Sequence, residues 1–205
     1  GSLGLIGTAL TLNNTLTLNT GSVIVDNNAN GRNTLGGGVT LSGTNTITVG
    51  SSSFLTLAGA ITGSTTLSKT GTGTLGLSNN NSYSGTTTVT GGTLALQNSG
   101  ALGASSATMN SSTNLLLVGT GLNINNILAF QTNTTLVDNN ANGNNILGTG
   151  GITLAGTFNL NVANPTNSVL TITGNITGVG LTINKSGLGN LRLSGNKAYT
   201  GNLNV

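Results

Sequence analysis

Apolar residues alternate with threonine, serine or glycine in short runs along almost the whole chain. Runs such as ALTL, TLTL, SVIV, GVTL, TITV and TLAL are only a few residues long, and clusters of Gly, Asn and Ser separate them. A period of two is typical of strands that bury one face, and Gly and Asn suit the turns between such strands. No stretch keeps a helical apolar period without a Gly or Asn break. The sequence therefore predicts an all-β fold with almost no helix.

The pattern itself repeats along the chain. The phrase VDNNANG occurs at Val25–Gly31 and again at Val137–Gly143, and 16 of 31 positions are identical when residues 1–31 are laid on 113–143. Further on, the shift between the copies grows slightly, so that Lys69 matches Lys185. We predict one continuous segment, 1–205, in which residues 1–89 match 113–205, the unit is about 112–116 residues long, and 90–112 occur once.

Two architectures fit short strands in long repeats: an array of β-sandwich domains and a β-solenoid. A sandwich core is normally rich in large aromatic residues, whereas only 2 % of this chain is aromatic. A solenoid core is narrow and is filled by stacked Leu, Ile and Val, and Asn side chains can stack between its turns. We therefore predict a single-stranded parallel β-helix (a β-solenoid) with roughly 20 residues per turn.

One stretch carries a family signature. From Lys69 to Gly103 the sequence KTGTGTLGLSNNNSYSGTTTVTGGTLALQNSGALG resembles the passenger-associated repeat of bacterial autotransporters. The matching positions of the first copy are Lys69, Gly71, Gly73, Leu75, Leu77, Ser78, Asn81, Tyr83, Gly85, Thr87, Val89, Gly92, Thr93 and Leu94, and those of the second are Lys185, Gly187, Gly189, Leu191, Leu193, Tyr199, Gly201 and Val205. The resemblance implies a secreted right-handed β-helix and an export route rather than a particular activity.

The two copies of this signature are not identical. Asn79 stands where the family pattern has Gly, and the second copy restores that residue as Gly195. In turn, the second copy has Lys197 in place of Asn81 and Leu203 in place of Thr87. The strong match covers about 55 of the 205 residues.

Side chains that catalyse reactions are scarce. The chain has no His and no Cys, so the commonest general base and the usual zinc ligands are missing. Its only acidic residues, Asp26 and Asp138, are predicted to lie five or six turns apart, roughly 25–29 Å, whereas a glycosidase pair needs about 5–10 Å. We expect no enzyme and no cofactor.

The VDNNANG phrases admit two interpretations. A calcium site would gather several carboxylates, and each copy supplies one. We therefore expect no metal and interpret Asp26 and Asp138 as Asx turns, in which the carboxylate caps the following backbone and Gly31 or Gly143 takes a left-handed conformation. Pro165 is expected in a surface loop, because a proline cannot donate to a central ladder.

Lysine and tyrosine in the repeated signature also have structural and functional interpretations. We expect Lys69 and Lys185 to be solvated lysines at a strand edge, where they discourage aggregation. Tyr83 and Tyr199 could be exposed platforms for sugars, but we expect each ring to pack over a neighbouring turn of the motif.

The net charge of +3 comes from five scattered residues, Arg32, Lys69, Lys185, Arg192 and Lys197. Nucleic-acid binding needs clustered cations and stacking aromatics, so we expect no nucleic-acid partner. The longest apolar runs, such as Leu115–Val118, are far too short for a membrane helix, so no membrane insertion is expected in this segment.

These observations favour a structural and interaction protein. We expect a rigid rod, the stalk of an adhesin-like autotransporter passenger, that is extracellular or on a bacterial surface and belongs to a longer protein. Its partners would be cell-surface or glycan ligands, or copies of itself end to end. The alternative is a self-assembling extracellular fibre or sheath built from stacked solenoid units.

Overall fold

The computed structural model describes residues 1–164 and 167–205, so the turn predicted at Pro165 lies outside the described residues. The described regular structure consists of 25 strands, and no helix is found within it. The chain divides into two compact units, Gly1–Ala107 and Thr108–Val205.

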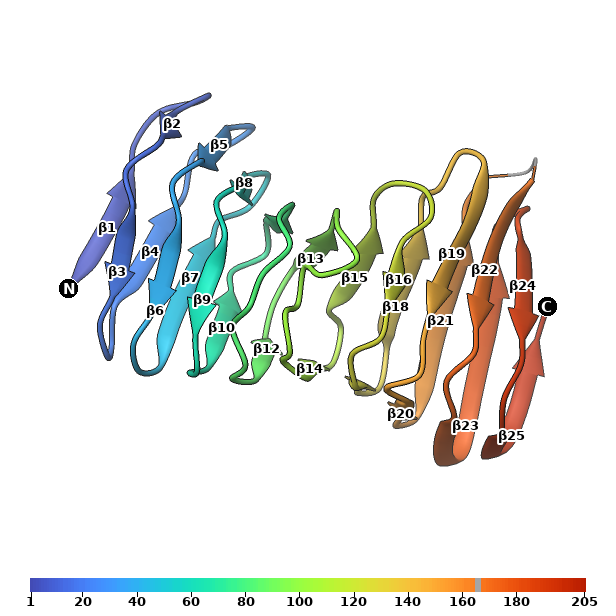
Figure 1. Cartoon of the computed structure of the whole chain (residues 1–205). Coiled ribbons are helices and arrows are strands. Elements are labelled where there is room, and N and C mark those ends of the chain that lie inside the picture. The colour runs from blue at the N-terminus through green and yellow to red at the C-terminus, as the bar shows by residue number, and fades with distance from the viewer. Residues whose placement is uncertain (165–166) are drawn as a thin grey trace. The chain divides into compact units, whose positions relative to one another are not determined.

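The first unit is a coil of parallel strands (Figure 1). Each strand pairs with the strand one turn further along the chain, so three ladders run through the unit: β1–β4–β7–β10–β12, β2–β5–β8–β11–β13 and β3–β6–β9. Its strands are β1 (Ser2–Leu5), β2 (Thr11–Leu12), β3 (Leu16–Leu18), β4 (Val23–Asp26), β5 (Arg32–Leu35), β6 (Val39–Leu41), β7 (Asn45–Val49), β8 (Phe54–Leu57), β9 (Ile61–Gly63), β10 (Leu67–Thr70), β11 (Thr74–Leu77), β12 (Thr87–Val89) and β13 (Thr93–Leu96).

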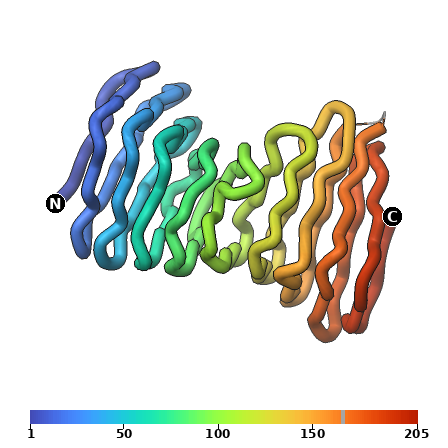
Figure 2. Tube along the Cα trace, viewed as in Figure 1, coloured from blue at the N-terminus to red at the C-terminus, as the bar shows by residue number. Residues whose placement is uncertain are grey.

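The second unit is built in the same way, and Figure 2 shows the chain coiling through it. Its ladders are β15–β18–β21–β23–β25, β16–β19–β22–β24 and β17–β20–β23–β25, in which the long strands β23 and β25 each serve two faces. Its strands are β14 (Ala107–Met109, which begins at the last residue of the first unit), β15 (Asn114–Leu117), β16 (Asn123–Ile124), β17 (Leu128–Phe130), β18 (Thr134–Asp138), β19 (Gly143–Leu147), β20 (Ile152–Leu154), β21 (Thr157–Val162), β22 (Ser168–Ile172), β23 (Ile176–Ser186), β24 (Asn190–Leu193) and β25 (Lys197–Asn204).

The predicted fold class is confirmed: both units are all-β solenoids of parallel strands. The turns are slightly longer than expected, at ~22 residues per turn. Their length also varies, because more residues separate Asn159 from its partner Asn184 than separate Thr74 from its partner Thr93. Surface turns between short strands absorb these differences.

Stacked apolar residues fill the core. In the first unit, leucines in register on four successive turns are at most 1 % exposed: Leu35, Leu57, Leu77 and Leu96. In the second unit the rings of Phe130 and Phe158 lie 4.8 Å apart at 50°. Each turn therefore buries its apolar face against the turns on either side, as solenoids do.

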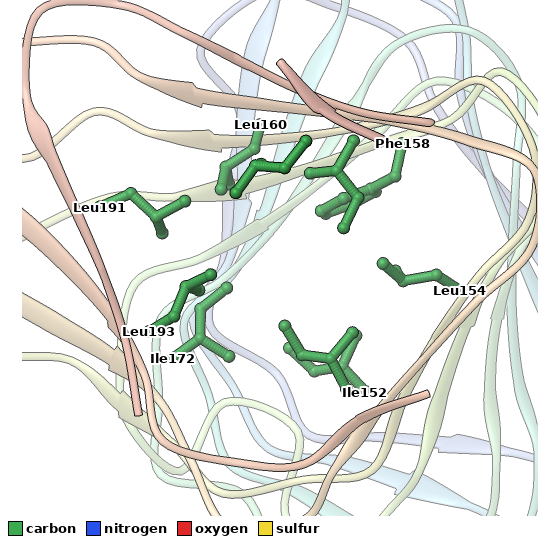
Figure 3. Close-up of a pocket in the computed structure, with 10 residues that line it drawn as sticks. Ile152, Leu154, Phe158, Leu160, Ile172, Leu191 and Leu193 are labelled. Atoms are coloured by element: carbon green, nitrogen blue, oxygen red, sulfur yellow. The ribbon is translucent and has the colours of Figure 1, made fainter. Parts of the chain in front are cut away.

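Figure 3 looks into the second unit, where apolar side chains from several strands converge on the interior. The space left between them is only about 10 Å³. A cavity of that size has room for about one water and none for an organic ligand. This interior is a packed core.

Polar side chains also stack outside the core. The amide of Asn184 donates to Asn159 Oδ1 over 3.1 Å, and that of Asn204 donates to Asn184 Oδ1 over 2.8 Å. Thr48 and Thr70 similarly share a hydroxyl hydrogen bond of 2.8 Å. Asparagine ladders, which were expected between turns of the solenoid, therefore occur along the strands and connect successive turns.

Candidate functional site

The aspartate of the first VDNNANG phrase is a core residue. Asp26 ends β4 in register with Leu5 on one side and Val49 on the other, and it is completely buried. The alternation in VIVD gives the reason, because residues two apart point to the same face of a strand and Ile24 points inward. Its Oδ1 accepts hydrogen bonds from the side-chain amides of Asn28, at 3.0 Å, and Asn33, at 3.1 Å.

The second phrase builds the same arrangement in the second unit. Asp138 ends β18 in register with Leu117 and Val162 and is also completely buried. Its Oδ1 accepts from the side-chain amide of Asn145 over 2.9 Å and from the backbone N–H of Asn140 over 3.3 Å. The Asn140 contact has the geometry of an Asx turn. In the first copy, by contrast, the hydrogen bonds to the carboxylate come from side chains.

Asn33 joins this carboxylate to the preceding turn of the solenoid. Besides its bond to Asp26, its amide donates to the carbonyl of Gly7 over 3.0 Å, and its Oδ1 accepts the backbone N–H of Leu10 over 2.7 Å. One buried side chain thereby satisfies two backbone groups that lie outside the strand ladders. Left unpaired, such buried groups would each cost about 1–3 kcal/mol.

Asn145 repeats these contacts one unit later. Its amide donates to the carbonyl of Gly119 over 2.9 Å, and its Oδ1 accepts the N–H of Leu122 over 2.8 Å. Each member of this second set occupies the position in the repeat that its counterpart holds in the first. Neither asparagine was singled out from the sequence. The available signal was an Asn seven positions after the Asp in both copies, at an inward position of the alternation.

Each buried carboxylate accepts its hydrogen bonds through one oxygen, Oδ1. The second oxygen of each, Oδ2, has no hydrogen-bond partner among the described residues. Burial raises the pKa of Asp138 above its ordinary value, and the hydrogen bonds from Asn145 and Asn140 oppose that rise. No group of three or more His, Cys, Asp or Glu residues is found in the described part of the chain. The hydrogen bonds of each aspartate–asparagine pair connect neighbouring turns of the solenoid.

The turn that follows each aspartate differs from the expected geometry in one copy. Gly143 has a φ of 122°, in the region that favours glycine, but in the first copy the left-handed residue is Asn30, with a φ of 62°. The expectation for Gly31 was therefore wrong. A glycine is needed at Gly31 for space, because a Cβ there would lie 2.9 Å from the Cβ of Asn28.

Lys69 is buried, which corrects the expectation of a solvated edge lysine. It lies in the core ladder in register with Ile47 and Val89 and is 0 % exposed. Its ammonium group donates to the carbonyls of Thr70, Gly71 and Gly91, at 3.0, 2.8 and 2.9 Å. The aliphatic stem thus fills the core while the charged end closes a corner between two turns. Burial lowers the pKa of Lys69 to about 8.

Lys185 makes part of the same contact in the second unit. It is half-buried, in register with Leu160, and its ammonium group donates to the carbonyls of Ser186 and Gly187 at 3.3 and 2.8 Å. These two carbonyls correspond to those of Thr70 and Gly71.

Tyr83 is also completely buried and offers no platform to a sugar. Its hydroxyl shares a 2.8 Å hydrogen bond with Thr87, which shares one of 2.9 Å with Ser105. Burial raises the pKa of the Tyr83 hydroxyl, and these hydroxyl contacts oppose the shift. Its counterpart Tyr199 is half-buried.

Asn81, two residues before Tyr83, bridges the turns on either side of its own. Its Oδ1 accepts the N–H of Ile61 over 2.8 Å, and its amide donates to the carbonyl of Ala101 over 2.6 Å. Lys197, which replaces it in the second unit, instead donates to the carbonyl of Gly174 over 2.7 Å and to that of Ser194. Both side chains serve as links between backbones.

The other motif residues are glycines that fit between closely spaced turns and apolar residues that pack in the core. A Cβ at Gly71, Gly73, Gly85 or Gly201 would approach a backbone oxygen of the neighbouring turn to about 2.0–2.2 Å, and Gly187 and Gly189 are similarly crowded. The apolar motif residues of the first unit, Leu75, Leu77 and Val89, are completely buried. In the second unit Leu191 and Leu193 line the packed interior (Figure 3), while Val205, the last residue, is exposed.

The fold and these contacts define a class: a parallel β-solenoid whose repeated polar residues hold its turns together. The family model of the passenger-associated-transport-repeat matches residues 67–96 and 183–205, the two stretches that contain the lysine and tyrosine motifs. The predicted resemblance is confirmed, and the chain carries autotransporter passenger repeats.

A curated relative matches over a longer stretch. The chain is 34 % identical over 152 residues, 74 % of its length, to the adhesin BmaC autotransporter of Brucella suis biovar 1 (strain 1330). It spans only about 4 % of that relative's length. No solved structure matches the chain.

Proposed function

We propose that this chain is a rod-like segment of an adhesin-like autotransporter passenger, exposed on or secreted from a bacterial surface, and that its role is mechanical rather than catalytic. The observation that carries this proposal is the use of buried polar side chains. Asp26, Asn33, Lys69 and Asn81 in the first unit all bind backbone or side-chain groups of the solenoid itself. Chemistry on a substrate would require such groups to be accessible.

The comparisons also support the proposal. The chain matches the passenger-associated-transport-repeat, and its relative is named as an adhesin. No helix among the described residues is long and apolar enough to span a membrane. The rod would hold other parts of a longer protein away from the cell, and its outer faces would be available to surface or glycan ligands.

The spacing role can be tested in the full-length protein by changing the number of turns. Val23, Thr46 and Ser68 occupy the same register on successive turns, so residues 23–67 form a cassette of two whole turns. Four extra cassettes should move a distal epitope outward by about 38 Å, since neighbouring strands are about 4.8 Å apart. Localisation microscopy of the epitope relative to the outer membrane measures this distance.

An unchanged epitope height in these insertion variants, with normal amounts of protein at the surface, would reject the spacing role. Ordered filaments of the purified chain under the electron microscope would instead favour the alternative of a self-assembling fibre, with copies joined end to end.

A further inference from the structure

A comparison of the two copies of the repeat shows which positions they share and which differ. The aspartate–asparagine links occur in both copies, but the outer face of the β5–β8–β11 ladder differs between them. Arg32, Phe54 and Gly76 in the first unit correspond to Asn144, Val169 and Arg192 in the second, as the pairing of each with its neighbours shows. The second unit forms a solenoid with an Asn144–Val169 pair at these positions in place of the Arg–Phe pair.

Arg32 and Phe54 form a stacked pair on this face. They are paired in register on adjacent turns, and the guanidinium carbon of Arg32 lies 4.9 Å from the centre of the Phe54 ring. Arg32 is exposed and Phe54 is half-buried. A stacked guanidinium retains in-plane N–H groups for hydrogen bonding.

Gly76 makes room for the ring. A Cβ at Gly76 would lie 3.1 Å from Cε1 of Phe54 and 3.0 Å from the side-chain nitrogen of Gln97. The Phe54 ring therefore reaches across the next turn, which holds the ring, and the guanidinium stacked on it, in a defined place.

A groove of about 440 Å³ opens beside this pair, at the corners of three successive turns. Apart from Arg32 and Phe54 its lining consists of hydroxyl, amide and backbone groups, from Asn30, Ser52, Ser53, Thr72, Gly73 and Thr74. Its volume lies in the range of small-molecule sites, roughly 300–1,000 Å³. A lining of this composition suits a ligand with many hydroxyl groups.

The charge of the surface narrows the class of ligand. Asp26 and Asp138, the only acidic residues, are completely buried, so the side chains that carry charge at the surface are cationic. A guanidinium binds carboxylate and sulfate groups through two parallel hydrogen bonds. Arg32 can therefore hold an anionic group at one side of a groove rich in hydroxyls.

We propose that this groove binds an acidic saccharide, with its carboxylate or sulfate on Arg32 and its hydroxyl groups against the serine, threonine and asparagine side chains. The proposal deepens the adhesin-like role proposed above by naming a ligand class and a site. The binding measurement does not involve the length of the rod, so its failure would leave the spacing role standing.

The test is isothermal titration calorimetry of the whole purified chain with four probes. Oligogalacturonate carries carboxylates, a heparin oligosaccharide carries sulfates as well, maltohexaose is neutral, and inorganic sulfate is an anion without a sugar. Comparison of the first two probes shows whether a carboxylate is enough for binding or a sulfate is required. Binding of at least one acidic oligosaccharide, at least about tenfold tighter than of maltohexaose or inorganic sulfate, is expected.

Variants locate the site. R32Q should weaken binding about tenfold or more, because it removes a charge-assisted contact, and F54V, which installs the residue of the second copy, should weaken it several-fold by releasing the guanidinium. R192Q is the matched control, since it removes the same charge from another exposed arginine, and it should change binding less than about twofold. Thermal melting checks that each variant is folded.

Several outcomes would overturn the proposal. These are no binding of either acidic oligosaccharide, equal losses in R32Q and R192Q, and equal affinity for inorganic sulfate. Equal affinity for a single-stranded DNA oligomer would also overturn it, because it would show attraction to any polyanion.

Discussion

Asn145 donates its side-chain amide to Asp138 over 2.9 Å and so binds a charged group inside the apolar core of the solenoid. Asn33 makes the same contact with Asp26 in the other unit, over 3.1 Å. In both pairs the asparagine also reaches the backbone of the preceding turn. The asparagine carries the connection between turns, and the aspartate positions the asparagine.

This division of roles predicts different costs for the two partners. Asn145→Ala leaves the Asp138 carboxylate, the Gly119 carbonyl and the Leu122 N–H without this partner, and should destabilise the fold by roughly 2–4 kcal/mol. Asp138→Asn keeps an acceptor oxygen and puts an amide where Oδ2 has no partner, so it should cost about 1 kcal/mol or less. Urea denaturation of both variants measures the difference. A larger loss in Asp138→Asn than in Asn145→Ala would contradict the assignment.

The same aspartate predicts a pH effect on the acid side. Because burial raises the pKa of Asp138 above 3.8, the folded state holds this proton more tightly than the unfolded state. The stability that it contributes is therefore present at low pH and lost as pH rises through the folded pKa. The wild type should lose stability relative to Asp138→Asn as pH rises from below 3.8 towards neutrality. A stability difference that stays constant, or grows in favour of the wild type, would refute this.

Lys69 predicts an effect of opposite sign on the alkaline side. Its pKa is lowered to about 8 from 10.5, so its stabilising contribution is present above the unfolded value and lost as pH falls through 8. Relative to Lys69→Met, the wild type should gain roughly 2 kcal/mol between about pH 8 and pH 9.5. The upper limit of this range keeps the measurement below the ionisation of tyrosine in the unfolded chain.

Lys185→Met provides the matched control for Lys69→Met, because Lys185 occupies the same motif position but is only half-buried. Lys69→Met should lose more of the alkaline dependence of the wild type than this variant does. If the two variants behave alike, the burial of Lys69 does not cause that dependence.

Core positions of the two copies should respond unequally to a buried amide. Ile124 is completely buried and pairs with Leu147, whereas its counterpart Leu12 is only half-buried. Ile124→Asn should cost roughly 2–5 kcal/mol and Leu12→Asn about 1–2, although the two residues occupy the same position of the repeat. Ile127, 58 % exposed on the next segment, is the control, and Ile127→Asn should change stability by less than about 0.5 kcal/mol. Denaturant midpoints of the three variants give the order.

Strand faces could be predicted from the sequence because they depend on alternation alone. The alternating pattern marks apolar positions such as Leu75 and Leu77, which are completely buried, and the passenger repeat was recognisable from its glycines, lysine and tyrosine. The same alternation also points Asp26 and Lys69 inward, whereas Asp26 was interpreted as an Asx turn and Lys69 as a solvated lysine at a strand edge. Both are buried, because a solenoid corner offers carbonyl and amide partners to polar side chains in the core.

Contacts between turns could not be predicted, because they depend on the length of each turn. Arg32 lies opposite Phe54 on the following turn, while its neighbour Asn33 reaches back to Gly7 on the preceding one. A change of one residue in a turn would bring different side chains together. Neither the polar links nor the arginine groove follow from the strand pattern.

Neighbouring turns of the solenoid approach each other closely, which explains much of the glycine content. A Cβ at Gly59 would lie 1.9 Å from the carbonyl oxygen of Gly37 on the preceding turn, whereas one at Gly38 would meet its nearest atom, the oxygen of Ala60, at an ordinary 3.5 Å. Neither glycine has a positive φ, so the two alanine variants differ in space rather than in backbone conformation.

Gly59→Ala should therefore push two turns apart and destabilise the fold by more than about 2 kcal/mol, as overpacking against a rigid backbone does. Gly38→Ala should lie within about 0.5 kcal/mol of the wild type or be slightly stabilising, because alanine loses less chain entropy on folding than glycine. Thermal unfolding of the two variants, followed by β-sheet circular dichroism, compares them directly. Equal melting temperatures would mean that neighbouring turns can separate at this corner without cost, and the close stacking of Gly37 and Gly59 would then not be a determinant of stability.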